Sequence, residues 1–231
     1  MSIIIKNLDK SYHGKKILNN LSIMVKNGEM IAITGKSGSG KSTFLNIIGL
    51  LEKPDAGTIS IDGTNHFSRK TRRLFLRDKI GFIFQNFALI EEESIRENLA
   101  LALHHIPKGK KETEMKKALQ EVGINHDLKT KIYTLSGGEQ QRVAIARVLL
   151  KKCDIILADE PTGSLDEENR DHIMQLIKKL NDQGKTIIIV THDQKVAAYC
   201  DRIIDLDKEN RRYSHTEEVT IPPYEERKLN N

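Results

Sequence analysis

Apolar residues of this chain gather in short runs, and these runs alternate with stretches in which apolar positions recur every three or four residues. The short runs predict β-strands and the periodic stretches predict helices. The predicted strands cover residues 3–12, 17–28, 29–35, 57–63, 80–85, 153–160, 186–190 and 202–206. The predicted helices between these strands cover residues 41–51, 69–78 and 167–180. Strands that alternate with helices in this way favour a parallel sheet joined by right-handed crossovers.

A long helical stretch interrupts the strands. Residues 86–152 have mostly helical periodicity and no convincing strand, which predicts an inserted helical lobe. Residues 1–85 and 153–207 then form the core of one domain, because 231 residues suit a single large domain with an inserted lobe. After Lys208 the chain turns polar and carries Pro222 and Pro223, so residues 208–231 are predicted to be a C-terminal appendage.

The composition is that of a globular protein with a strongly solvated surface, since 38% of the residues are hydrophobic and 30% are charged. No apolar run reaches the roughly 18–20 residues that a membrane-spanning helix needs, and the first residues do not resemble a signal peptide. We therefore expect the chain to stay in the cytoplasm. Cys153 and Cys200 lack the spacing of a metal or redox motif and are expected to be plain buried thiols.

The net charge of +5 comes from basic residues that are dispersed among acidic ones. A nucleic-acid-binding surface is one interpretation of a basic excess, but the lack of clustering favours an ordinary mixed surface and no nucleic-acid partner. A slight basic excess also suits a protein that works beside an anionic membrane face.

The clearest chemical motif follows the third predicted strand. The segment GKSGSGKS, residues 35–42, has the spacing G-x-x-x-x-G-K-[ST] and lies between an apolar strand and a helix. In this context glycine backbone N–H groups and a helix N-terminus can surround phosphate oxygens, and a lysine and a hydroxyl can reach the phosphates and Mg²⁺. The alternative is an ordinary Gly/Ser turn. The expected nucleotide-binding residues are Gly35, Lys36, Ser37, Gly38, Ser39, Gly40, Lys41, Ser42 and Thr43.

Several polar residues follow the ends of predicted strands, where α/β sheets place their ligand-binding groups. Asp159 is expected to hold Mg²⁺ together with Ser42, and Glu160 is expected to deprotonate an attacking water. His192 and Gln85 end two further strands; His192 could contact the γ-phosphate, and Gln85 could touch both the metal and the attacking water. A surface acidic pair and a structural histidine are the alternatives, and the strand-end positions favour catalysis.

A second anion site is predicted at the start of another helix. Ser136 and Glu139 have the S-x-x-E spacing of a capping box, which explains how the helix begins. It does not explain Gly137 and Gly138, because each glycine in a helix costs about 1 kcal/mol relative to alanine. Bare backbone at a helix N-terminus lets an anion approach closely. We expect the anion to be a phosphate that is bound elsewhere.

With these motifs in view, the chain resembles the ATP-binding cassette (ABC) ATPases. The segment LSGGEQQR resembles the family signature, residues 35–43 its Walker A loop, and Asp159 and Glu160 its Walker B aspartate and catalytic glutamate. Gln85 resembles the Q-loop glutamine, His192 the switch histidine, and Tyr12 the aromatic residue that stacks on adenine; from its position alone, Tyr12 could equally be a core or surface residue. The resemblance covers residues 3–207 and implies an α/β P-loop NTPase (RecA-like) core with an N-terminal antiparallel β subdomain and an inserted α-helical subdomain.

The resemblance also implies ATP and Mg²⁺ as ligands, and a dimer in which two cassettes enclose two ATP molecules. Ser136, Gly137 and Gly138 would then contact the γ-phosphate held by the other cassette. The chain has one copy of each motif and no internal repeat, which favours a homodimer. Glu139 departs from the glutamine that is commonest at this position of the signature, but it keeps the capping box.

Within the family, the chain most closely resembles the macrolide- and lipoprotein-exporter (MacB/LolD-like) group, and the acidic segment 90–95 with residues 84–91 resembles a lactococcin-type bacteriocin-export branch. This resemblance implies a separate transmembrane permease of the FtsX/MacB type, and a peripheral location on the inner face of the cell membrane. The implied cargo is a peptide or bacteriocin, an antibiotic or a lipoprotein. An importer ATPase is the first alternative. A soluble ABC protein is the second, although such proteins carry tandem cassettes or long coiled-coil insertions, which this chain lacks.

Overall fold

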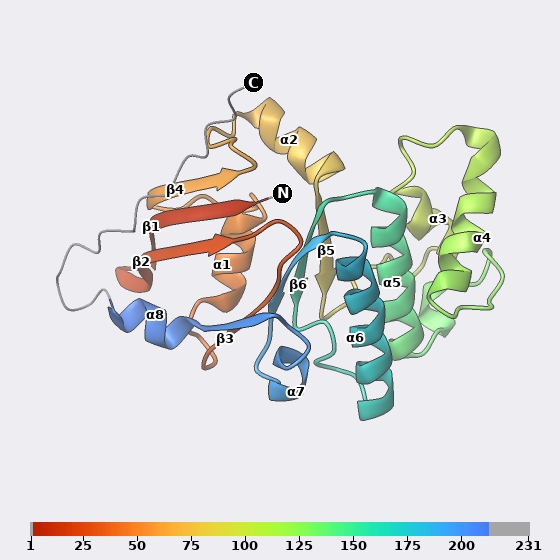
Figure 1. Cartoon of the computed structure of the whole chain (residues 1–231). Coiled ribbons are helices and arrows are strands. Elements are labelled where there is room, and N and C mark those ends of the chain that lie inside the picture. Colours follow the sequence, from red (N-terminus) through yellow and green to blue (C-terminus); the bar gives the residue numbers. More distant parts are fainter. Residues whose placement is uncertain (1, 213–231) are drawn as a thin grey trace, which may run out of the picture.

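The computed structural model of the chain describes residues 2–212, which form two sheets and the helices that cover them (Figure 1). The strands are β1 Ile3–Tyr12, β2 Lys15–Val25, β3 Met30–Thr34, β4 Ala56–Ile61, β5 Ile80–Phe84, β6 Ile155–Asp159, β7 Thr186–Val190 and β8 Arg202–Asp205. The α-helices are α1 Lys41–Ile48, α2 Arg69–Asp78, α3 Ile95–Ala100, α4 Lys111–Glu121, α5 Gly137–Lys151, α6 Glu167–Asp182, α7 Gln194–Ala197 and α8 Leu206–Arg212. Short 3₁₀ turns are η1 Lys108–Lys110 and η2 Ile132–Thr134.

The larger sheet has five strands in the order β5-β6-β7-β3-β8, and all neighbouring strands run parallel. Every residue of β3 and β7 is buried, because helices cover both faces of the sheet and no face is left for polar side chains. The predicted parallel sheet is confirmed. Since parallel strands end at one edge, the sheet brings the residues that follow β3, β6 and β7 together at that edge.

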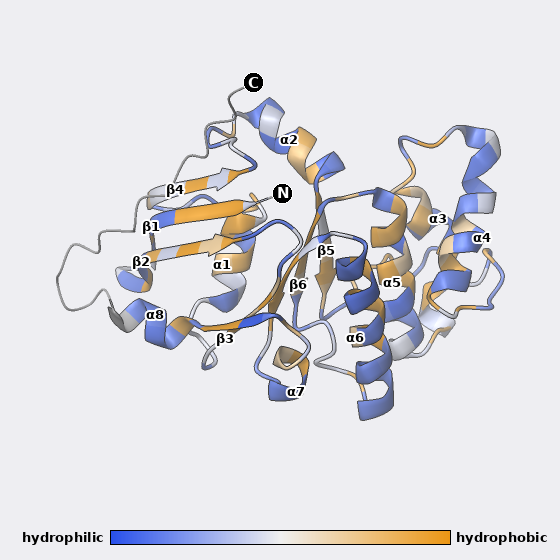
Figure 2. Ribbon diagram, in the orientation of Figure 1, coloured by the Kyte–Doolittle hydropathy of each residue, from blue (hydrophilic) through white to orange (hydrophobic). Residues whose placement is uncertain are grey.

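The smaller sheet is antiparallel and has the order β2-β1-β4. Alternate residues of β1 point inward, and Ile3 and Ile5 are at most 1% exposed. They belong to one apolar core with Phe44 and Ile47 of α1, which also contacts Leu157 of the larger sheet. Helix α1 therefore lies between the two sheets, and the expected antiparallel β subdomain is confirmed. In Figure 2, β5 and β6 of the larger sheet are mostly hydrophobic, whereas β1, β2 and β4 of the smaller sheet mix hydrophobic and hydrophilic segments.

Helices α3, α4 and α5 lie on the opposite side of the larger sheet from the smaller one (Figure 1). Residues 86–152, all of which are described, form helices and 3₁₀ turns and no strand, with one isolated bridge between Ser94 and Lys131. Their apolar side chains share a core with α6 and with one face of the larger sheet. No helix within residues 2–212 is long and apolar enough to cross a membrane.

The helices differ from the predicted ones at four places, one of which is the end of α6 at Asp182 instead of Leu180. Helix α1 ends at Ile48 rather than near residue 51, because Leu50 takes a left-handed conformation with φ of 58°. Short helix α7 was not predicted. Neither was α8, which begins at Leu206, runs through the predicted boundary at residue 208 and packs against β2, where Asn210 Nδ2 donates to the carbonyl of Ile17 at 3.2 Å. The rest of the predicted appendage, with both prolines, lies outside the described residues.

Candidate functional site

The loop between β3 and α1 has a backbone shape that only glycine permits at its end. Gly40 precedes the first helical residue with φ of 93° and ψ of 12°, in the left-handed region. A Cβ atom at this position would lie 2.6 Å from Ile17 Cγ2, so a larger residue would collide with β2. Helix α1 therefore starts with exposed N–H groups that point back into the loop, which is the arrangement that binds phosphate.

The side chain of Lys41 folds back onto the loop and bonds to its backbone. Its Nζ donates to the carbonyls of Gly35 and Lys36, both at 2.9 Å, so the cation stands where a phosphate chain would pass. From outside, the backbone N–H of Lys36 donates to Asp207 Oδ2 of α8 at 2.8 Å. Asp207 was not among the site residues predicted from the sequence. It nevertheless follows the end of β8, and strand ends are where the other site residues also lie.

The loop borders an open hollow of about 430 Å³, a volume that fits a small ligand. One member of the loop, Ser39, has a buried hydroxyl without a hydrogen-bond partner among the described residues, so an added acceptor or donor would satisfy it. The hollow is lined by Tyr12, Ile17, Ser37, Gly38, Gly40, Lys41, Ser42, Thr43, Asp159, Glu160 and Val190. The donors present, backbone N–H groups, a lysine and hydroxyls, fit the phosphates of a nucleotide.

Ser42 and Asp159 face each other across this hollow. Ser42 Oγ donates to Asp159 Oδ1 at 3.3 Å, which joins the start of α1 to the end of β6. Burial raises the pKa of Asp159, because the charged carboxylate loses water, and the hydrogen bond from Ser42 and the charge of Lys41 do not fully offset that loss. A hydroxyl beside a carboxylate is an oxygen donor set of the kind that Mg²⁺ takes, so the two residues fit that metal.

Glu160 and His192 form a second polar pair, at the ends of β6 and β7. Glu160 Oε1 lies 2.7 Å from His192 Nδ1 and accepts from the His192 backbone N–H at 3.1 Å. Thr191 Oγ1 donates to the other carboxylate oxygen at 3.1 Å. The backbone of Glu160 has φ of 44°, a left-handed conformation that is rare for a residue with a side chain and common at active sites. Three donors thus orient a mostly buried carboxylate at the rim of the hollow, where a general base belongs.

Tyr12 and Gln85 differ in how they relate to the hollow. Tyr12 lines it, and its hydroxyl donates to Glu52, which raises the pKa of the tyrosine. Lys10 Nζ lies 5.3 Å from the centre of the same ring, so the ring is held from two sides. Gln85 is exposed and lies against Gly163, outside the residues that line the hollow. The adenine, metal and water roles of Tyr12 and Gln85 stay predictions.

The signature helix begins as predicted. Ser136 Oγ accepts from the Glu139 backbone N–H at 3.4 Å, and Glu139 Oε2 accepts from the Ser136 N–H at 2.8 Å, which is the reciprocal capping box. Ser136, Gly137 and Gly138 do not line the hollow described above. Their contact with a phosphate stays a prediction.

The two signature glycines have different environments. Gly138 is buried, and a Cβ atom there would lie 2.4 Å from Asn169 Oδ1 of α6. Gly137 is exposed, and a Cβ atom there would make only ordinary contacts of 3.6 Å with Phe87 and 3.8 Å with Leu165. Anion approach is therefore not needed to explain Gly138, because packing against α6 requires glycine at that position. At Gly137, by contrast, no neighbouring atom among the described residues would exclude a Cβ atom.

A parallel sheet with a phosphate loop, an acidic residue opposite its hydroxyl and a smaller antiparallel sheet defines a P-loop nucleotide-binding ATPase. The sequence of this chain matches the model of the ABC transporter family over residues 18–163. The ABC transporter ATP-binding protein MJ0796 of Methanocaldococcus jannaschii is 46% identical over 221 residues, which cover 88% of this chain and 92% of that protein. A dimeric MJ0796 structure bound to ADP and Pi has a TM-score of 0.81 at 41% identity and covers 88% of this chain and 93% of that chain. The chain belongs to the ABC transporter family as an ATP-hydrolysing cassette.

Two further relatives bear on the kind of transporter. The macrolide export ATP-binding/permease protein MacB of Campylobacter jejuni is 42% identical over 208 residues, and the chain spans about a third of its length, with 32% of MacB covered. The arginine transport ATP-binding protein ArtM of Bacillus subtilis is 40% identical over 210 residues, 89% of this chain and 88% of that protein.

Proposed function

We propose that this cassette is the ATPase subunit of a MacB-like exporter, that two copies close around two ATP molecules, and that closure drives a separate membrane permease. The observation that carries the proposal is the position of two polar pairs, Ser42 with Asp159 and Glu160 with His192, beside the phosphate loop. Together they supply the metal ligands and the base that hydrolysis of a bound nucleotide needs.

Residues that line the hollow, together with Gln85 and His192 at strand ends, divide the chemical work. The N–H groups of the loop and the Lys41 ammonium hold phosphate oxygens, and the Tyr12 ring offers a stacking face to the base. Ser42, Asp159 and Gln85 would hold Mg²⁺, which when bound neutralises the charge on the β- and γ-phosphate oxygens. Glu160 accepts the proton of the attacking water, and His192 keeps the carboxylate pointed toward it.

Dimerisation supplies what one copy lacks. Because the signature residues do not line their own chain's hollow, a two-fold arrangement can place them against the loop of the partner. Ser136 and the backbone of Gly137 and Gly138 then add donors to the γ-phosphate, where charge grows in the transition state. The dimeric form of MJ0796 supports this arrangement.

The likeness to the macrolide export protein MacB supports an exporter. We further propose a permease of the FtsX/MacB type on the inner face of the cell membrane, and a peptide or bacteriocin, an antibiotic or a lipoprotein as cargo. An importer ATPase is the second candidate, since ArtM is 40% identical over most of both chains. Affinity purification from native membranes separates the two. An exporter brings down a permease without a solute-binding protein, and an importer brings down a permease that also associates with one.

Replacing Glu160 by glutamine tests the ATPase proposal. We expect ATP hydrolysis to fall by about 100-fold or more, because a general base contributes at least that much. The variant should still bind ATP and should accumulate as an ATP-dependent dimer in multi-angle light scattering. Glu168→Gln, on the exposed first turn of α6, is the matched control and should behave as wild type. Near-normal hydrolysis by Glu160→Gln, or a monomer at saturating ATP, would contradict the proposal.

A further inference from the structure

The signature serine of this chain is bound to a carboxylate. Glu139 Oε2 accepts from both the N–H and the hydroxyl of Ser136, each at 2.8 Å. The other oxygen, Glu139 Oε1, lies 2.7 Å from His126 Nε2. One carboxylate therefore connects a histidine of the α4–η2 loop to the hydroxyl that begins α5. This contact, together with the capping bonds, lowers the pKa of Glu139 to about 2, so that the carboxylate is charged at neutral pH.

A charge at this position works against the proposed role of Ser136. If Ser136 faces the γ-phosphate of the partner's ATP, a carboxylate one hydrogen bond away repels that phosphate, and the surrounding protein screens the repulsion less than water does. Glutamine would keep the capping box without the charge. Among the described residues, His126 is the one basic residue whose side chain lies within ion-pair distance of Glu139.

His126 is held in place although its own side chain is 42% exposed. The neighbouring residues Ile124 and Leu128 are buried at 4% and 3% exposure, so they anchor the loop on both sides of the histidine. The carbonyl of Leu128 accepts from the N–H of Arg96 at 2.9 Å, which ties the loop to the start of α3. Because buried residues flank His126 in the sequence, the loop that carries it is anchored, and its contact with Glu139 is held by the fold.

We propose that His126 is a positioning residue for the signature: its Nε2 donates to Glu139 Oε1 and offsets part of the carboxylate charge, so that the Ser136 hydroxyl can turn from Glu139 Oε2 to the partner's γ-phosphate. The proposal rests on the proposed function, because it needs the two-fold ATP-bound dimer. A neutral glutamine at this position would not repel the γ-phosphate. The proposal explains how a cassette that has glutamate there can still bring Ser136 to that phosphate.

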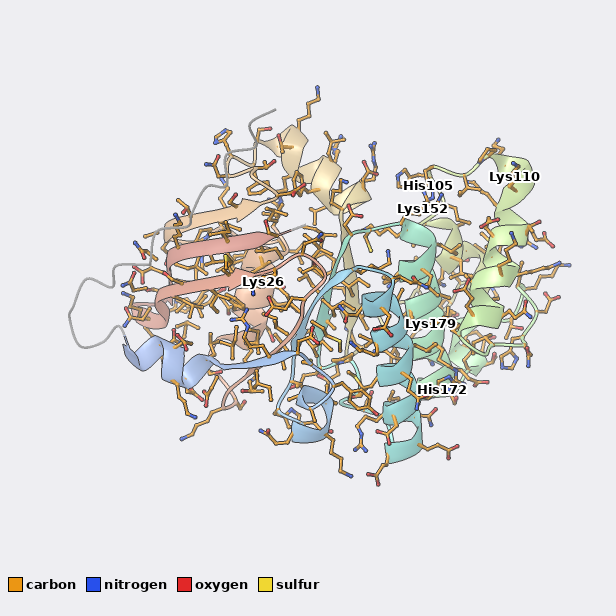
Figure 3. The ribbon with its side chains drawn as sticks, in the orientation of Figure 1. Lys26, His105, Lys110, Lys152, His172 and Lys179 are labelled. Carbon is orange, nitrogen blue, oxygen red and sulfur yellow. The ribbon has the colours of Figure 1, made fainter. Side chains whose placement is uncertain are left out.

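The test measures ATP-driven dimerisation of the whole chain in the Glu160→Gln background. ATP with Mg²⁺ is titrated, and light scattering gives the ATP concentration at half-maximal dimer. Adding His126→Ala should raise that concentration by about two- to fivefold, the modest size expected when a partly exposed charge contact is lost. His172→Ala, which truncates another exposed histidine on α6, is the control and should change nothing (Figure 3).

Rescue separates positioning from a merely structural role. With Glu139→Gln also present, there is no charge to offset, and His126→Ala should no longer raise the half-maximal ATP concentration. An equal effect of His126→Ala in the glutamate and glutamine backgrounds would overturn the proposal, and so would no effect in either. In both cases the parent variant still dimerises and the proposed function stands. A parent variant that never dimerises with ATP would overturn both.

Discussion

The phosphate loop and the signature differ in how far the chain alone satisfies their polar groups. At the loop, the Ser39 hydroxyl is buried without a partner among the described residues, and burial raises the pKa of Asp159. At the signature, both donors of Ser136 are bonded to Glu139, and Glu139 is bonded to His126. The loop thus keeps one buried hydroxyl without a partner among the described residues, whereas both donors of Ser136 are bonded within the chain. Under the proposed function, we expect from this difference that nucleotide binds to the loop of one copy first and that the signature of the partner joins afterwards.

The largest expected effect comes from removing the loop's cation. Lys41→Ala should weaken ATP binding by the isolated cassette about 10- to 100-fold, because a charge-assisted hydrogen bond contributes about 1.5–3 kcal/mol. Gly137→Ala is the matched change at the signature: it should leave ATP binding by the monomer unchanged and reduce dimerisation in the Glu160→Gln background. Equilibrium binding of a fluorescent ATP analogue and light scattering check the two results. If Gly137→Ala weakened monomer binding as much as Lys41→Ala, the proposed order would be wrong.

A smaller effect should separate the two signature glycines. Gly138→Ala places a methyl group against Asn169, whose Nδ2 is bonded to both carboxylate oxygens of Asp166, so the amide cannot move without loss. We expect a loss of about 1–3 kcal/mol in the free energy of unfolding, the usual cost of overpacking. Gly137→Ala should be neutral or stabilising by less than about 1 kcal/mol, since helix propensity improves and no clash arises. Urea denaturation of the two variants measures the contrast, and equal stabilities would contradict it.

The sequence predicted most of the fold because long apolar runs and clear helical periods coincide with burial. Thr186–Val190 was predicted to the residue, since all five side chains are buried in the larger sheet. The helices that were missed, α7 and α8, are short, and burial of a few side chains such as Val196 and Leu206 leaves no periodic pattern. Leu206 looked like the last residue of a strand because its apolar neighbours Ile203 and Ile204 belong to β8.

The site was predictable to the extent that its residues follow strands or form a local motif. The sequence predicted that Ser42 and Asp159 act together, and in the structure Ser42 Oγ lies 3.3 Å from Asp159 Oδ1. The contacts of Gly138 with Asn169 and of Glu139 with His126 could not be predicted, because they join segments whose distance depends on how α5 packs against α6 and against the loop after α4. The capping box was found because all its atoms lie within four residues.

The smallest expected effect concerns the charge of Asp159 and depends on pH. Since the folded state raises the pKa of Asp159 above its ordinary value of 3.8, the folded protein holds this proton more tightly than the unfolded chain does. The stability that this provides is present below pH 3.8 and is lost as pH rises through the folded-state pKa. Above the folded-state pKa and without Mg²⁺, the ionised carboxylate is therefore a net cost.

Asp159→Asn removes that cost and keeps an oxygen that can accept from Ser42. In metal-free, nucleotide-free buffer at pH 7 the variant should unfold at a higher temperature than wild type, and the difference should shrink as the pH falls toward 4. Asp182→Asn, at the exposed end of α6, is the control and should not show this pH-dependent gain. Adding ATP with Mg²⁺ should then stabilise wild type more than Asp159→Asn, because only the carboxylate gains a cation. Thermal unfolding followed by circular dichroism gives each value. A variant less stable than wild type at pH 7 without metal would show that the loop is already satisfied, and the contrast with the signature would fail.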